Sequence, residues 1–271
     1  MARVRPRRPA TLLAGLLLAG CTSLESGNDW WSVRASGQGD QARLHSTSHV
    51  NHGRPARESP IERRLLREAR RGTVSVAVHR DAALAGTWPA AAPVLAREVD
   101  EALDWMARVA GEQGASLVVT LVDDEHAVDV EHVNAAHPPV VELYVAADES
   151  ASSRSAAVGR ALAKGLHEVV HAVSAARGDA GADRLAEERR ASLVEACYLL
   201  DTVRPGDTVA LNAAAAHPHT DNFAILQSRA AAAAVVGELR RLAGATTVRP
   251  DDREARAALR RHCDQAAGSG R

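Results

Sequence analysis

The pattern of apolar positions changes near Pro60 and predicts where the folded part of the chain begins. Before that point the chain is rich in Ser, Gly, Asn, Gln and Arg and has little apolar periodicity, as in a flexible linker. After it, apolar residues recur with strand or helix spacing. We therefore predict a tether over residues 21–58, a folded domain over residues 59–249 and a polar tail over residues 250–271, in which a short helix can form.

Strands and helices alternate in the first part of the predicted domain. Alternating valines predict a strand over residues 73–78, and two further strands are predicted over residues 117–122 and 140–145. A short charged helix is expected over residues 61–71. An amphipathic helix is expected over residues 93–110.

The second part of the domain is predicted to contain only helices. Three Ala-rich segments have helical spacing, over residues 152–177, 183–203 and 221–242. Acidic residues and histidines over residues 123–132 have no recognised calcium-binding spacing, and we expect a solvated loop there. This order predicts an α+β fold, with a small mixed sheet and a helical C-terminal half.

Composition and charge narrow the class of protein. The chain has 271 residues, of which 46% are apolar, 25% charged and 3% aromatic, as in a globular protein of one domain or two small ones. Residues 1–72 contain 13 basic and 6 acidic residues, whereas residues 73–271 contain 20 and 28. No basic globular face is indicated, so nucleic acid is not an expected partner.

The N-terminal residues have the layout of a signal peptide. Four arginines precede an apolar run over residues 12–19, which is shorter than the roughly 20 residues that a permanent membrane-spanning helix needs. The run ends in Leu-Ala-Gly followed by Cys21, which resembles the lipobox of bacterial lipoproteins. The resemblance implies removal of residues 1–20 and lipidation of Cys21.

Lipidation would anchor the protein to a membrane of the bacterial cell envelope, facing the periplasm or the exterior. Thr22 follows the lipidated position, which in lipoproteins favours the outer membrane if the host has one. An ordinary secretory signal peptide with an incidental Cys21 is the alternative. Cys197 and Cys263 would then lie in an oxidising compartment, although the sequence leaves open whether they pair.

The main chemical motif is the HExxH sequence His167-Glu168-Val169-Val170-His171 within a predicted helix. Four residues advance an α-helix by about 400°, so both imidazoles leave the same face and can bind one tetrahedral metal ion. Glu168 is displaced by about 100° and would accept a proton from a metal-bound water. The alternative is a pair of helix histidines that only make hydrogen bonds.

A zinc site of this kind needs a third ligand, and the next predicted helix offers Glu187, Glu188 and Glu195. If this helix returns antiparallel, Glu188 lies level with His171, because each is about 9 Å from the turn at a rise of 1.5 Å per residue. Glu195 then lies about 18 Å along, beyond the level of the first histidine. Glu187 has a similar height but projects about 100° round the helix from Glu188. We therefore predict Glu188 as the third ligand.

An HExxH helix, a glycine turn and a returning helix with Glu-x-x-Ala, here Glu188 to Ala191, resemble the gluzincin branch of zinc metallopeptidases. The resemblance covers about residues 140–200. Several gluzincin families continue with Asp after the Ala, where this chain has Ser192. The hydrogen bond that this Asp makes to the metal site is therefore not carried over.

The resemblance implies a zinc-dependent peptidase that acts on a peptide or protein substrate. It implies zinc bound by His167, His171 and Glu188, with Glu168 as the general base. The alternative is a non-catalytic envelope lipoprotein that serves as a binding or structural module, with histidines that are metal-free or hold a structural ion.

Zincins also have a strand before the active-site helix whose free edge pairs with an extended substrate. Residues 140–145 are expected in that role, and a plain core strand is the alternative. Peptide hydrolysis further needs a donor for the oxyanion, for which the candidates are His217, His219 and Tyr144. The two histidines also fit a polar loop that precedes a helix N-cap at Asp221.

Overall fold

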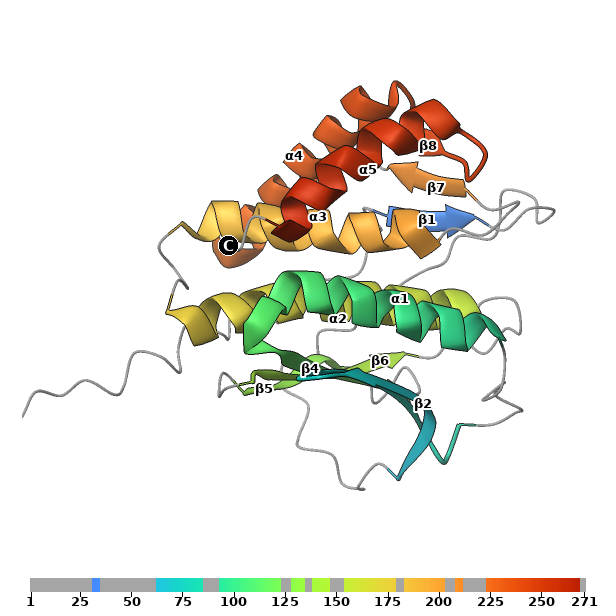
Figure 1. Cartoon of the computed structure of the whole chain (residues 1–271), viewed down its shortest axis with the longest axis vertical. Coiled ribbons are helices and arrows are strands. Elements are labelled where there is room, and N and C mark those ends of the chain that lie inside the picture. Colours follow the sequence, from blue (N-terminus) through green and yellow to red (C-terminus); the bar gives the residue numbers. More distant parts are fainter. Residues whose placement is uncertain are drawn as a thin grey trace, which may run out of the picture.

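The helices of the chain form layers on one face of a β-sheet (Figure 1). The computed structural model describes residues 31–34, 62–84, 93–122, 128–134, 138–146, 154–178, 183–202, 208–211 and 223–268. The helices are α1 (Pro93–Ala110), α2 (Arg154–Arg177), α3 (Arg184–Thr202), α4 (Phe223–Ala243) and α5 (Arg253–Gly268), and the short 3-10 helix η2 (Gly111–Gln113) follows α1. Helices α1 and α2 cover the sheet, α3 packs on both of them, and α4 and α5 pack on α3.

The main sheet has five strands in the order β2-β3-β4-β6-β5. They are β2 (Arg63–Arg71), β3 (Val74–Asp81), β4 (Ala115–Val122), β5 (Val128–Asn134) and β6 (Val140–Ala146). The three central strands are parallel, and each edge strand is antiparallel to its neighbour. Helix α1 is the crossover that parallel strands β3 and β4 require. The predicted α+β class is thus confirmed.

Alternate residues of the central strands build the core beneath α1 and α2. On β3, Val74, Val76 and Val78 are buried, while the residues between them are partly exposed, as the two-residue period of a strand requires. Leu117 of β4 continues this buried face, and α1 contributes the fully buried Trp105. The core therefore lies between the sheet and the first helical layer.

Gly165 lets α2 approach the sheet closely. A Cβ atom at this position would lie 2.6 Å from Leu117 Cδ1 and 3.0 Å from Leu143 Cδ1, and both distances are shorter than ordinary van der Waals contact. The glycine lies just before the two histidines of α2 in sequence. The sheet therefore determines the position of the helix segment that carries them.

The segment over residues 61–71 was expected to be a helix, and this expectation is wrong. Residues Arg63–Arg71 form the edge strand β2, which is joined to β3 by a two-residue turn. Gly72 in this turn has φ +60°, as tight hairpins of this kind require. Pairing with β3 outweighs the helical spacing of so short a segment.

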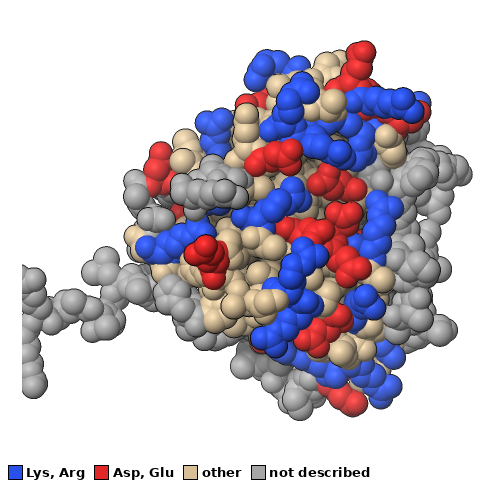
Figure 2. Space-filling model, viewed as in Figure 1, with Lys and Arg blue, Asp and Glu red and all other residues tan. Residues whose placement is uncertain are grey.

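Charged pairs between β2 and α1 cover this edge of the sheet. Arg67 lies 3.8 Å from Asp100, and Arg71 pairs with Asp104. Figure 2 shows that basic and acidic side chains are interspersed over the described part of this face. A charged edge strand of this kind resists pairing with other chains.

The segment over residues 123–132 was expected to be a solvated loop, and part of it is instead β5. This strand pairs with β6 and forms the other edge of the sheet. The expected free edge on residues 140–145 is also wrong, because β6 lies between β4 and β5. Of the described strands at this side of the sheet, β5 has the free edge. The sequence of β5 is polar and therefore did not predict a strand, because an edge strand tolerates polar side chains.

A second, antiparallel sheet contains β1 (Trp31–Arg34), β7 (Thr208–Leu211) and β8 (Thr247–Val248), in the order β1-β7-β8. Strand β1 falls within the predicted tether of residues 21–58. That part of the tether is therefore paired with the domain.

Within the predicted polar tail of residues 250–271, the structure contains the helix α5, which packs on α3 and α4. Its buried residues Ala255, Leu259 and Cys263 recur every four positions, so a narrow apolar stripe faces the domain. Cys263 forms a disulfide with Cys197 of α3, with their Cα atoms 5.6 Å apart. The pairing that the sequence left open therefore links the last helix to the third.

We expect Gly165→Ala to lower the free energy of unfolding by about 1–3 kcal/mol, because the new methyl group overpacks the contact with Leu117. Gly237→Ala is the matched control, because Gly237 lies in α4 and a Cβ atom added there would meet no heavy atom within 4 Å among the described residues outside its own helix backbone. That change should stabilise the protein by up to about 1 kcal/mol, the helix preference of Ala over Gly. Urea denaturation of both variants checks this, and equal shifts would contradict close packing at Gly165.

We expect reduction of the Cys197–Cys263 disulfide to lower the free energy of unfolding by about 2–4 kcal/mol, because the unfolded chain gains entropy. Chemical denaturation with and without a reductant measures the change, and a thiol assay confirms the reduction. The double variant Cys197→Ala/Cys263→Ala should not respond to the reductant. An unchanged midpoint for the fully reduced wild type would show that the disulfide does not stabilise the fold.

Candidate metal centre

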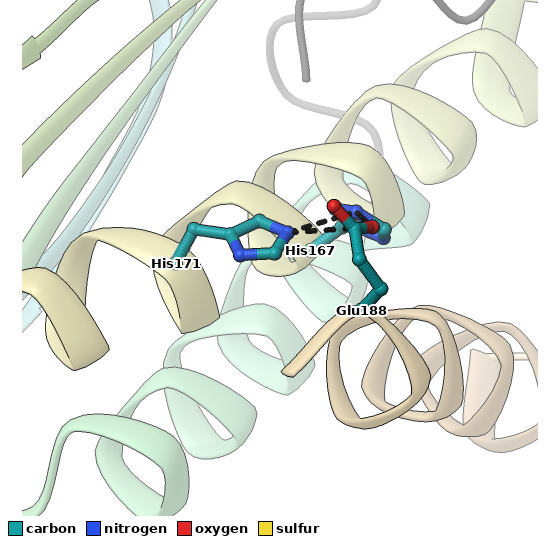
Figure 3. Close-up of side chains that lie close together, drawn as sticks. All are labelled: His167, His171 and Glu188. Atoms are coloured by element: carbon teal, nitrogen blue, oxygen red, sulfur yellow. Dashed lines mark hydrogen bonds and ion pairs between the residues drawn. The ribbon is translucent and has the colours of Figure 1, made fainter. Parts of the chain in front are cut away.

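Three side chains from two neighbouring helices meet in the interior of the protein (Figure 3). His167 and His171 project from α2, and Glu188 projects from α3 toward both of them. The contacts of His171 with Glu187 and of His167 with Glu195 show that the two helices run antiparallel. The register predicted for Glu188 is therefore the observed one.

The three side chains fit a single metal ion. Nε2 of His167 and Nε2 of His171 are 3.3 Å apart, and Oε2 of Glu188 lies 3.7 Å from each of them. Zinc binds nitrogen and oxygen ligands at about 2.0–2.1 Å in tetrahedral sites, which corresponds to ligand separations of about 3.3–3.4 Å. The observed triangle is within a few tenths of an ångström of that size.

The three groups are almost completely removed from solvent. His167, His171 and Glu188 are 3%, 7% and 1% exposed, and polar groups this deeply buried are normally paired or bound to a metal. Burial by itself would lower the pKa of His167, but interactions with the carboxylates of Glu188, Glu195 and Glu168 raise it to about 10. The surrounding carboxylates thus favour a positive charge at this point.

The outer nitrogen of each imidazole has its own carboxylate on α3. Nδ1 of His171 donates to Oε1 of Glu187 at 2.8 Å, and Nδ1 of His167 donates to Oε2 of Glu195 at 3.2 Å. Spacing along the sequence did not assign these two glutamates to the site. The sequence signal that could have found them is that both lie in the same helix as Glu188, one residue before it and seven residues after it.

Glu195 was expected to lie beyond the level of the first histidine, and this expectation is wrong for its side chain. Side chains in a helix lean toward its N-terminus. Because α2 and α3 are antiparallel, the N-terminal direction of α2 is the C-terminal direction of α3. Glu195 and His167 therefore lean toward each other. The carboxylate therefore reaches the outer face of the ring.

Helix α3 is held near both of its ends. At the start, the backbone N–H of Ala186 donates to the side chain of Asp183 at 3.0 Å, which is the geometry of an N-cap. The negative charges of Glu187 and Glu188 lie near this end, where the helix dipole favours them. Near the other end, Cys197 is bonded to α5. These contacts fix the position of α3 along α2, and with it the level of Glu187, Glu188 and Glu195 relative to the two histidines.

Glu168 is deeply buried beside the ligand triangle, next to His167 in sequence. It is 4% exposed, and its Oε1 atom has no hydrogen-bond partner in the described part of the chain. Burial raises the pKa of its carboxyl group, an effect opposed by His167, His171 and Lys164. A buried carboxyl oxygen without a partner is costly for a fold, so this group is a candidate for chemistry.

Tyr144, a candidate oxyanion donor, faces away from the triangle. Leu143 packs against Gly165 of α2, and neighbouring residues of a strand point to opposite faces of a sheet. The Tyr144 hydroxyl instead pairs with Arg63 of β2. The expectation for Tyr144 is therefore wrong. His217, His219 and the lipidation candidate Cys21 lie outside the described residues.

No protein-family model, no curated protein and no solved structure matches the chain.

We expect Glu188→Gln to weaken zinc binding at least about tenfold, because the neutral amide replaces the anionic ligand. Loss of even an outer hydrogen-bond partner commonly costs a metal site this much. Competition with a chromogenic chelator measures the affinity. Glu142→Gln is the control, because Glu142 pairs with Arg63 at 3.1 Å on the far face of the sheet. Equal affinities of the two variants would exclude Glu188 as a ligand.

Proposed function

We propose that the protein is a zinc-dependent peptidase with a zincin-like fold, anchored to the bacterial cell envelope by a lipid on Cys21. The observation that carries the proposal is the triangle of two imidazole nitrogens and one carboxylate oxygen, with separations of 3.3–3.7 Å, beside the buried Glu168. The residues present fit a zinc ion in both ligand chemistry and spacing.

The number of ligands favours a catalytic ion over a structural one. Structural zinc sites are usually closed by four protein ligands, whereas catalytic sites have three and keep one position open. Within the described residues, the metal-binding group has three members, His167, His171 and Glu188. An open position is what a hydrolytic site needs for water and substrate.

The residues of the chain divide the work of hydrolysis. A zinc ion held by His167, His171 and Glu188 would supply a Lewis acid that lowers the pKa of water and polarises a carbonyl group. Glu168 accepts the proton of the attacking water at its carboxylate. It then delivers this proton to the amine that leaves as the peptide bond breaks.

Two further observations support a peptide substrate and an extracytoplasmic location. Strand β5 is an edge strand of the sheet beneath α2, and a free strand edge can bind an extended peptide through main-chain hydrogen bonds. The Cys197–Cys263 disulfide is typical of oxidising compartments such as the periplasm or the exterior. Export by the predicted signal peptide agrees with this chemistry.

The deep burial of the three ligands also favours a second candidate function. A non-catalytic envelope lipoprotein could use the same triangle to hold a structural ion between α2 and α3. This candidate has no use for Glu168, whose buried Oε1 atom has no hydrogen-bond partner among the described residues and would then only reduce stability. A variant of Glu168 therefore separates the two functions.

We expect Glu168→Gln to retain zinc and thermal stability but to lose peptide hydrolysis by about 10²–10⁴-fold or more, because this residue serves both proton transfers. Zinc content, thermal unfolding and turnover of a mixed peptide library are measured for wild type and variant. Glu254→Gln, on the exposed side of α5, is the control and should keep full activity.

Equal turnover by wild type and Glu168→Gln would remove Glu168 from the mechanism. Tight zinc binding without hydrolysis by the wild type across the library would favour the structural module. Absence of zinc after zinc resupply would overturn the proposed peptidase.

A further inference from the structure

Each imidazole of the ligand triangle makes contacts at both of its ring nitrogens, and the two kinds of contact differ. Its inner atom, Nε2, faces the other imidazole and Glu188, and its outer atom, Nδ1, faces a second carboxylate of α3. The inner contacts measure 3.3–3.7 Å and suit an ion between them, whereas the outer contacts of 2.8 and 3.2 Å are hydrogen bonds.

The outer contacts determine which nitrogen of each ring carries the hydrogen. An ionised carboxylate can only accept a hydrogen bond, so Glu187 and Glu195 each retain a hydrogen on the Nδ1 atom they contact. A neutral imidazole then has its lone pair on Nε2. In this neutral form, which binding of a metal ion in place of the proton would favour, both lone pairs are directed to the inside of the triangle.

The positions of the two carboxylates on α3 make this arrangement possible. Glu195 lies seven residues after Glu188, which is about 700° or nearly two full turns, so both project from the same stripe of the helix. Glu187 lies one residue before Glu188 and projects to the side, where His171 meets it. The chain has Ser192 where the Asp of related motifs stands, and Glu195 contacts the first histidine instead.

We propose that Glu187 and Glu195 are positioning residues, each of which orients one zinc-binding histidine through its Nδ1 atom. This inference rests on the proposed zinc site, which it deepens. The two residues act through His171 and His167 and do not contact the ion. Pre-orientation of ligands by such partners commonly contributes about 10–100-fold in metal affinity.

The two contacts are not equivalent, and the difference predicts an order of effects. Glu187 is closer to its histidine, at 2.8 Å compared with 3.2 Å, and its side chain is less exposed, at 14% compared with 24%. A shorter and better shielded hydrogen bond to a charged group contributes more. Loss of Glu187 should therefore weaken zinc binding more than loss of Glu195.

The test compares alanine and glutamine at both positions in the full-length protein. We expect Glu187→Ala to weaken zinc binding about 10–100-fold and Glu195→Ala about tenfold. Glutamine retains an oxygen that accepts the same hydrogen bond, so Glu187→Gln and Glu195→Gln should recover a large part of the affinity. Chelator competition measures zinc affinity. The visible absorption of the cobalt-loaded protein reports the ligand geometry.

Two controls separate positioning from a general effect on the fold. Leu185→Ala changes an exposed residue of α3 and should leave zinc affinity and the cobalt spectrum unchanged. Thermal unfolding of each zinc-free variant shows whether α3 is intact, and the glutamine variants keep the comparison valid if an alanine variant does not fold. If the two glutamates had a purely structural role, the zinc affinity of each variant would follow the thermal stability of its zinc-free form. The glutamine variants would then not recover zinc affinity relative to the alanine variants.

The outcomes distinguish this inference from the proposed function. Wild-type affinity and an unchanged cobalt spectrum in all four glutamate variants would overturn the positioning role while leaving the zinc site intact. Affinities that follow zinc-free stability would also overturn it. Failure of the wild type to bind zinc would overturn both the site and the inference.

Discussion

The site depends on the register of α3 against α2. Two imidazole nitrogens and one carboxylate oxygen meet in the buried interface of these helices, where polar groups are stable only with partners or a bound cation. A shift of one residue along α3 would rotate Glu188 by about 100° and bring Glu187 or Arg189 to the histidines. The N-cap at Asp183 and the disulfide at Cys197 oppose such a shift.

Helix α2 is held on two sides, and this makes the site rigid. Gly165 meets Leu117 and Leu143 of the sheet, while His167, two residues later, meets Glu188 of α3. Because protein interiors are close-packed, α2 cannot move toward either neighbour without steric overlap or leave it without a cavity. The imidazoles are thereby fixed by packing as well as by hydrogen bonds, as precise metal and catalytic sites require.

The proposed chemistry uses groups that the fold itself does not need. The outer nitrogens of His167 and His171 are satisfied by carboxylates, whereas their inner nitrogens and Glu188 converge on one point. Glu168 adds a buried oxygen without a hydrogen-bond partner among the described residues. Such groups reduce the stability of a fold, and their concentration at one place is typical of functional sites.

Local spacing in the sequence predicted the bounds of α1 and the shared face of the two histidines. The rise per residue predicted that Glu188 lies level with the histidines. These properties could be predicted because each depends on one helix or one short turn. Only the tertiary structure decided that residues 63–71 form a strand, that β5 is the edge strand beside β6 among the described strands, and that α5 is bonded to α3. It also decided that Glu187 and Glu195 reach the outer nitrogens. These features depend on which distant segments pair and on how side chains lean between packed helices, and neither is determined by periodicity within a single segment.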